Sequence, residues 1–362
     1  TDPPAVATPT STDPPAVATP ASTDPPPLLD TRNRTAQKER FMTLTDQDAT
    51  HFAGAFDQMV ANIEKAVRGK TYVTRLALTC LIAGGHLLVE DNPGTGKTQL
   101  AKALANTIEG THSRIQFTPD LLPTDITGVS VYDQSTQRFA FRPGPVFASI
   151  VLADEINRAS PKTQSALLEV MEEGRVTVDG QPHGVGSPFM VIATQNPIEQ
   201  AGTYRLPEAQ LDRFLMKTSL GYPDHDTTVE LLADAENRDR SGAIEPILRA
   251  DSVRAMSAQA GLVHVDPSIL SFIALIGEES RRHSHVSLGL SVRGGLAFVR
   301  SAKTWALSQG RPYVTPDDVK GLAQPVLAHR ILLGDEAQFS GVRVGDVIDE
   351  LIDSVPAPAY RP

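Results

Sequence analysis

The chain has 362 residues, of which 40% are hydrophobic and 21% charged, and its formal net charge is −10. This length allows two domains with a large buried core, and the acidic balance disfavours non-specific binding to nucleic acid. The single cysteine, Cys80, excludes an internal disulfide and a multi-cysteine metal site, and no apolar run approaches the roughly 18 residues of a membrane helix.

The chain opens with a repeat: "TDPPAVATPTS", then "TDPPAVATPAS", then "TDPP". Prolines at this density remove backbone donors and prevent helix formation, and few side chains here could build a core. We therefore expect residues 1–47 to form a disordered leader rich in Pro, Thr and Ala. A docking peptide is the alternative.

Two helices are predicted next, each with apolar residues at intervals of three or four positions. The first ends near Gly69 and carries Phe52, Phe56, Met59, Ile63 and Val67. The second runs into Gly84-Gly85 and carries Val73, Leu76, Cys80 and Leu81.

Four short apolar runs then predict buried strands: "HLLVE", "SIVLA", "FMVIAT" and "MKTSL". Helical segments such as "TQLAKALANTIEG" separate them, which is typical of a parallel sheet covered on both faces. We expect this α/β core to span residues 48–222. Within it, "DITGVSVYDQSTQRFAFRPG" and "GRVTVDGQPHGV" alternate apolar and polar residues around turn-formers, and both predict β-hairpins.

The pattern becomes almost entirely helical after Tyr222-Pro223. We expect a small helical domain over residues 223–335. It includes a run from Ser291 that places Leu296, Val299, Trp305 and Leu307 among alanines. Residues 336–362, which end in "SVPAPAYRP", are predicted to be a C-terminal tail.

The stretch "EDNPGTGKTQ" follows the first predicted strand and opens a helix. Gly94 and Gly96 allow a tight turn whose backbone N–H groups point at a phosphate, with the helix dipole behind them. Lys97 would reach the β- and γ-phosphates, and the Thr98 hydroxyl would take a Mg²⁺ position. Asp91 stands where the pattern has its first glycine, and an ordinary turn with an exposed lysine is the alternative. The expected nucleotide contacts are Asn92, Pro93, Gly94, Thr95, Gly96, Lys97, Thr98 and Gln99.

Polar side chains also follow two later strands. Asp154 could hold Mg²⁺ through water, and Glu155 could polarise a water against the γ-phosphate. Asn196 could hold the attacking water or a γ-phosphate oxygen. The plainer alternatives are acidic residues that merely end a strand, and a turn-forming asparagine before Pro197.

Arginines provide the last candidate groups, since a planar fork of donors stabilises charge spread over phosphate oxygens. Arg205 and Arg213 lie in "RLPEAQLDRF", and Arg293 lies in "GLSVRGG" within the helical domain. Each of them could instead be a surface salt-bridge partner.

Taken in order, these elements resemble the AAA+ ATPases, and among them the MoxR family. The resemblance covers roughly residues 48 to 332. It rests on "HLLVEDNPGTGKTQLAKALA", "RIQFTPDLLPTDITG", "GPVFASIVLADEINRASPKTQSALLEVMEEGRVTVDG", "FMVIATQNPIEQAGTYRLPEAQLDRFLMK" and "GLSVRGG". It implies an α/β core with a five-stranded parallel sheet between helices and β-hairpin inserts, followed by an all-α lid.

The resemblance also implies roles for the residues singled out above. Walker A is formed by Gly94, Gly96, Lys97 and Thr98, and Walker B by Asp154 and Glu155, with Glu155 the catalytic base. Asn196 matches sensor 1, Arg213 the arginine finger that reaches a neighbouring subunit's nucleotide, and Arg293 sensor 2. The hairpins near 128–142 and 175–186 resemble the helix-2 insert and the pre-sensor-1 hairpin. Two departures are Asp91 in Walker A and "GLSVRGG" in place of a small-Ser-Pro-Arg-Ala string.

By the same resemblance, we expect a cytoplasmic ATPase that uses ATP and Mg²⁺ and assembles as a homo-oligomer, a hexameric ring, without membrane insertion. It would act as a chaperone that matures, assembles or metal-loads a client complex, with a von Willebrand factor A-domain partner. No residue identifies the client. The alternatives are a magnesium-chelatase-like ATPase subunit, a nucleic-acid motor and a non-hydrolysing nucleotide switch. Nucleic acid is disfavoured because the predicted hairpins carry mostly neutral or acidic side chains, Arg138 excepted.

Overall fold

The computed structural model describes residues 44–91, 94–196, 203–234, 236 and 239–359. The leader predicted for residues 1–47 lies outside this range except for its last four residues. Helix α2 spans Asp46–Glu64, so helical structure begins slightly earlier than predicted. A capping box explains the start: the Thr45 hydroxyl accepts from the Asp48 N–H, and the Asp48 carboxylate accepts from the Thr45 N–H.

The core of the chain is a parallel five-stranded sheet in the order β2-β5-β8-β1-β9. Its strands are β1 (Leu87–Glu90), β2 (His112–Gln116), β5 (Ile150–Asp154), β8 (Met190–Gln195) and β9 (Met216–Thr218). Four of them fall on the predicted apolar runs. The apolar pattern did not identify β2, because this edge strand buries only Ile115 of its five residues.

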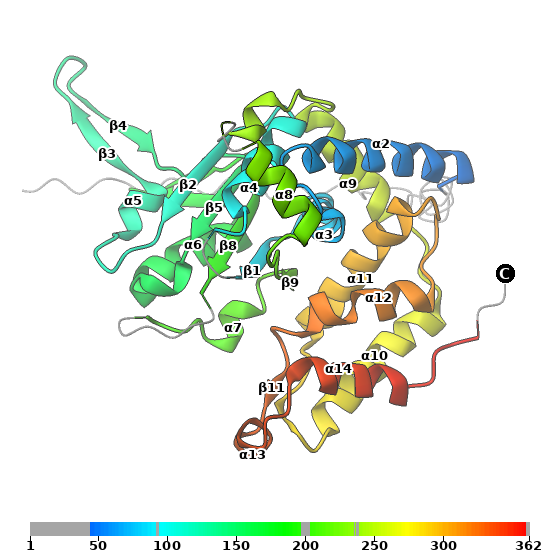
Figure 1. Cartoon of the computed structure of the whole chain (residues 1–362). Helices are drawn as coiled ribbons and strands as arrows, with labels where there is room; N and C mark the ends of the chain where they lie inside the picture. The colour runs from blue at the N-terminus through cyan, green and yellow to red at the C-terminus, as the bar shows by residue number, and fades with distance from the viewer. Residues whose placement is uncertain (1–43, 92–93, 197–202, 235, 237–238, 360–362) are drawn as a thin grey trace, which may run out of the picture. The chain divides into compact units, whose positions relative to one another are not determined.

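Helices cover both faces of the sheet, as the alternation of side chains along each strand requires (Figure 1). In β1, Leu87 and Val89 join one apolar cluster, whereas Leu88 joins the other. The first cluster includes α2, α3 (Thr71–Ile82) and α4 (Lys97–Thr107), and the second includes α6 (Pro161–Glu173). Each fully buried aliphatic side chain contributes roughly 1.5–3 kcal/mol to this packing.

Both predicted hairpins are present. The first pairs β3 (Gly128–Asp133) with β4 (Arg138–Pro143), and the second pairs β6 (Arg175–Val178) with β7 (Gln181–Gly184), each antiparallel. The β3–β4 hairpin extends away from the sheet (Figure 1). A short helix, α5 (Pro123–Thr127), takes the first residues of the segment predicted as the first hairpin.

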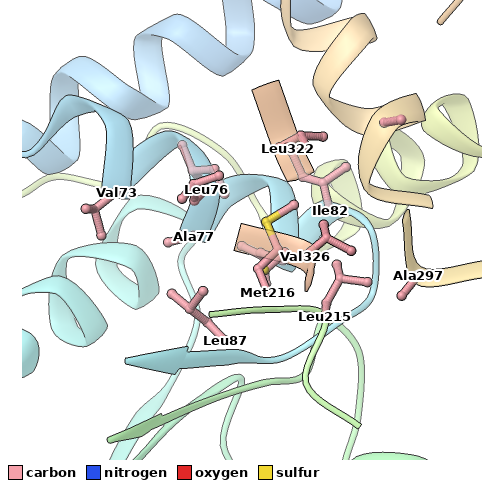
Figure 2. Close-up of a cluster of buried hydrophobic side chains, with 14 of the residues drawn as sticks. Val73, Leu76, Ala77, Ile82, Leu87, Leu215, Met216, Ala297, Leu322 and Val326 are labelled. Carbon is pink, nitrogen blue, oxygen red and sulfur yellow. The ribbon is translucent and has the colours of Figure 1, made fainter. Parts of the chain in front are cut away.

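The helical domain follows the last strand. Its elements are α8 (His225–Ala233), η2 (Arg240–Ala243), α9 (Ala250–Gly261), α10 (Pro267–Arg282), α11 (Val292–Ser308), α12 (Pro316–Leu327), α13 (Asp335–Phe339) and α14 (Val344–Ser354), with a small β10–β11 pair at Val286–Leu288 and Leu332–Leu333. Its apolar side chains share a cluster with the sheet domain. Figure 2 shows Leu322 and Val326 of α12 beside Met216 and Leu215 at β9.

The tail predicted from residue 336 is wrong over most of its length. Helix α14 buries Val347, Ile348, Leu351 and Ile352 against the lid. Apolar residues at helical spacing, with Asp and Glu on the other face, explain this packing. The boundary placed between residues 222 and 223 stays a prediction. None of the helices in the described residues has the length and apolar composition needed to cross a bilayer.

Candidate nucleotide-binding site

Three neighbouring strands, β5, β8 and β1, end at one cleft of about 260 Å³. Parallel strands place their carboxyl ends at the same sheet edge, which is where ligands bind in open α/β sheets. The cleft brings together Gly94, Thr95, Gly96, Lys97, Thr98, Gln99, Asp154, Glu155 and Asn196, all predicted from the sequence. Asn92 and Pro93 lie outside the described residues.

The glycines of the loop adopt backbone conformations that other residues rarely take. Gly94 has φ of 85° and Gly96 has φ of 96°, and Gly96 is the N-cap of α4. A Cβ atom at either position would meet nothing within 4 Å, so open space faces both. Among the described residues no side chain caps α4, because its N-cap is Gly96. The loop and the helix end therefore fit a phosphate chain.

Two side chains in the first turn of α4 make contacts within the protein that bear on their roles. Lys97 Nζ donates to the backbone carbonyl of Asp91 at 3.3 Å, which keeps the ammonium group at the cleft. The Gln99 side-chain oxygen accepts from the Ser241 N–H at 3.2 Å. This contact joins Gln99 to η2, so in this structure the amide oxygen of Gln99 takes part in packing within the protein.

Asp91 does not present its carboxylate to the phosphate loop. Oδ2 accepts from the Leu220 and Gly221 N–H groups at 2.6 and 3.0 Å, and Oδ1 accepts from the Ser219 hydroxyl at 3.3 Å. The residue is 7% exposed, and its backbone φ is not positive. The acid is therefore satisfied by the segment after β9.

Thr194 in β8 joins the two acidic residues at the end of β5. Its hydroxyl donates to Asp154 Oδ1 at 2.6 Å and accepts from the Glu155 N–H at 2.8 Å. Thr194 was not among the residues predicted for the site. The available signal was a hydroxyl side chain near the end of "FMVIAT", in the strand that pairs with β5.

Glu155 has a left-handed backbone, with φ of 55° and ψ of 51°. Such a conformation is strained for a residue with a Cβ and is concentrated at functional sites. Glu155 Oε2 accepts from Arg158 Nη1 at 2.9 Å, so the carboxylate is paired in this structure. A water at this oxygen would share it with Arg158 or displace Arg158, and the second carboxylate oxygen is a further acceptor.

The donor set suits a Mg²⁺ ion. The Thr98 hydroxyl and the Asp154 carboxylate lie in the same cleft, and both are hard oxygen ligands of the kind Mg²⁺ prefers. Arg114 Nη2 donates to Asp154 Oδ2 at 2.6 Å and to the Gln116 side-chain oxygen at 2.9 Å. A cation at Asp154 therefore shares the carboxylate with Arg114 or displaces it.

The remaining predicted residues lie elsewhere. Arg213 and Arg293 line a second cleft of about 220 Å³, where both pair with Glu172, and neither is among the residues that line the first cleft. Arg205 is exposed. Thus the described residues predicted for Walker A, Walker B and sensor 1 lie at one cleft, and those predicted for the arginine finger and sensor 2 lie at a second cleft.

Comparisons with known proteins show which families this chain is similar to. Residues 86–216 match the ATPase family associated with various cellular activities (AAA), and residues 278–351 match the AAA lid domain. The uncharacterised protein YeaC of Bacillus subtilis is 46% identical over 302 residues, which is 83% of this chain and 94% of YeaC. Chaperone MoxR1 of Mycobacterium tuberculosis is 37% identical over 83% of this chain and 82% of its own.

Two further similarities extend over nearly the whole of the matched proteins. Protein MoxR of Methylorubrum extorquens is 29% identical over 87% of this chain and 99% of its own. A crystal structure of a candidate ATPase from Cytophaga hutchinsonii matches with a TM-score of 0.80 and 33% identity, over 91% of this chain and 100% of that one.

Proposed function

The chain belongs to the MoxR family of AAA ATPases, and on that premise we propose that it hydrolyses ATP at sites that two neighbouring subunits complete. The observation that carries this proposal is the first cleft, where the glycine loop, Lys97, Asp154, Glu155 and Asn196 meet. A binding protein without turnover would need the loop and the lysine alone.

Each residue of the cleft then has a physical task. The N-terminus of α4 and Lys97 bind the phosphate chain through N–H groups and an ammonium charge. Thr98 and Asp154 hold Mg²⁺, which neutralises charge on the β- and γ-phosphate oxygens. Glu155 orients and deprotonates a water, and Asn196 fixes the position of that water or of a γ-phosphate oxygen.

The place of Arg213 and Arg293 supports completion by a neighbour. Both arginines lie at the second cleft, so in a head-to-tail arrangement they face the first cleft of the next subunit. Contacts of this heterologous type close into rings when the rotation allows. We propose a homo-oligomeric ring, with six subunits expected from the family resemblance, in which both arginines act in trans.

We further propose a chaperone role in the cytoplasm, acting on a client complex together with a von Willebrand factor A-domain partner. The name of the relative MoxR1 supports the chaperone role. The β3–β4 hairpin supports a contact with a client, because Tyr132 and Phe139 pair on its surface with exposed fractions of 49% and 73%. Exposed aromatic side chains are enriched at protein interfaces.

Calorimetry and turnover measurements test the ATPase. Lys97→Ala should weaken Mg·ATP binding at least about tenfold, because an ammonium–phosphate contact is lost. Glu155→Gln should keep the affinity and lower kcat by about 10² or more, because the general base is removed. Lys102→Ala is the matched control, since Lys102 lies on the same helix and pairs with Asp239.

The two variants separate binding from catalysis. Unchanged Mg·ATP affinity in Lys97→Ala would remove the phosphate loop from the proposal. Turnover by Glu155→Gln at the rate of the parent chain would show that Glu155 is not the base.

A further inference from the structure

Glu172 joins the two arginines predicted to reach a neighbouring subunit. Its Oε2 pairs with Arg213 Nη2 at 3.1 Å, and its Oε1 accepts a close contact from Arg293 Nη2. Arg213 comes from the sheet domain, just after α7 (Glu208–Leu211), and Arg293 comes from the first turn of α11 in the lid. One carboxylate therefore bridges guanidinium groups from two domains. Without it, two positive charges would lie side by side.

The backbone beside Glu172 is held by a buried histidine. His86 Nε2 donates to the carbonyl of Met171 at 3.0 Å, and His86 Nδ1 accepts from the Val191 N–H at 3.0 Å. His86 is 6% exposed. These contacts fix the last turn of α6 to strand β8. The backbone that carries Glu172 is therefore held in place by both elements.

The segments that carry the two arginines are also bonded to each other. The Ser291 hydroxyl, at the N-cap of α11, donates to Asp212 Oδ2 at 2.7 Å. Arg330, whose side chain is 2% exposed, donates to Asp212 Oδ1 at 2.7 Å and to the carbonyls of Phe214 and Leu215 at 2.5 and 3.1 Å. A buried arginine with this many acceptors ties the lid to the chain on both sides of Arg213.

The charges around Glu172 favour an anionic ligand. The second cleft is lined by four arginines, including Arg300, and by two carboxylates, Glu172 and Asp212. Arg213 Nε is buried and finds no hydrogen-bond partner among the described residues. A buried donor without an acceptor is unfavourable, so the arrangement against Glu172 leaves one donor of Arg213 unsatisfied.

We propose that Glu172 is a positioning residue that holds Arg213 and Arg293 as one unit for the terminal phosphate of a neighbouring subunit's ATP. This inference rests on the proposed function. Because both side chains are long and repel each other, the bridge limits their rotamers before the subunits meet. It also makes the lid and the sheet domain present their charges together.

Replacement of Glu172 by glutamine tests the proposal, with Glu173→Gln as the matched control. Glu173 is the next residue of α6 and pairs instead with Arg175, at 3.0 Å on the surface. We expect Glu172→Gln to lower kcat about tenfold, since small misplacements of transition-state contacts have effects of this order or larger. The KM and the Kd for Mg·ATP should stay within about twofold, because binding in the first cleft is untouched. Glu173→Gln should match the parent chain.

A second comparison separates positioning from a structural role. In Arg293→Ala, adding Glu172→Gln should lower kcat little further, because one of its two partners is already absent. Glu172→Asp, which keeps the charge, should recover part of the kcat lost in the glutamine variant. This recovery is expected even if the glutamine variant has a lowered melting temperature. The inference is wrong if Glu172→Gln keeps or raises kcat, if the losses multiply, or if Glu172→Asp recovers nothing. If the parent chain itself does not hydrolyse ATP, the proposed function fails, and this inference fails with it.

Discussion

Asp91 occupies the first-glycine position of the phosphate-loop pattern, where an acid would repel phosphate. The structure resolves this conflict, because the carboxylate accepts two backbone N–H groups and a hydroxyl from residues 219–221. The backbone carbonyl of the same residue accepts from Lys97 Nζ. Asp91 thus contacts Lys97 through its backbone carbonyl and the segment that follows β9 through its carboxylate.

Asp91→Asn should destabilise the protein by about 1–3 kcal/mol, because hydrogen bonds to a buried charged acceptor are lost. The Mg·ATP affinity should change little, since the carboxylate is already bonded to residues 219–221. Denaturant unfolding and calorimetry measure the two quantities. Glu90→Gln is the control: its surface pair with Lys217 contributes at most about 1 kcal/mol. A marked gain in ATP affinity for Asp91→Asn would contradict this role.

At the scale of elements, His86 joins the end of α6 to strand β8, and its protonation at Nδ1 would remove the acceptor for the Val191 N–H. Burial lowers the pKa of His86 to about 4, against 6.5 for an ordinary histidine. Burial likewise lowers the pKa of His329, which contacts the Phe214 carbonyl at 3.0 Å. Both histidines are therefore neutral in the folded chain over a pH range in which the unfolded chain binds protons.

The sign of the pH dependence follows from this difference. Above pH 6.5 neither state carries the proton at His86, and stability is complete. As the pH falls from about 6.5 to about 4, only the unfolded state binds the proton, and His86 alone removes about 3 kcal/mol. His86→Gln should reduce the slope of the unfolding free energy against pH between about pH 4 and 6.5, by the amount that corresponds to about one proton bound on unfolding. The exposed His51 gives the control, and identical slopes for the parent and His86→Gln would contradict the prediction.

At the scale of the whole molecule, each protomer of the proposed ring would supply two different parts of a catalytic site. The first cleft carries the loop and the acids, and the second carries the arginines with Glu172. The two clefts have no lining residue in common. Because the two clefts are separate, we can predict the ATPase activity of a mixture of subunits in which each variant lacks one of them.

Arg213→Ala and Lys97→Ala should each be almost inactive alone and should regain activity when mixed. In a mixed ring, about a quarter of the interfaces would combine an intact phosphate loop with an intact arginine from the neighbour. Steady-state ATPase assays over a range of mixing ratios measure this, with Glu173→Gln plus Lys97→Ala as a reference mixture. Activity that never exceeds the sum of the two separate variants would exclude completion in trans.

Sequence alone determined the elements whose signals are local. Period-2 and period-3.6 patterns located four strands, both hairpins and the main helices, and the glycine–lysine spacing after β1 located the phosphate loop. The apolar pattern did not identify edge strand β2, because an exposed edge needs no apolar run. Helix α14 was not predicted either, although apolar residues recur at helical spacing within it. Tertiary structure alone decided where side chains distant in sequence meet. The carboxylate of Asp91 reaches residue 220, Thr194 reaches Asp154, and Glu172 reaches Arg293, over 129, 40 and 121 positions. Such pairings follow from the order of the strands and the docking of the lid, and the local pattern of residues predicts neither of them.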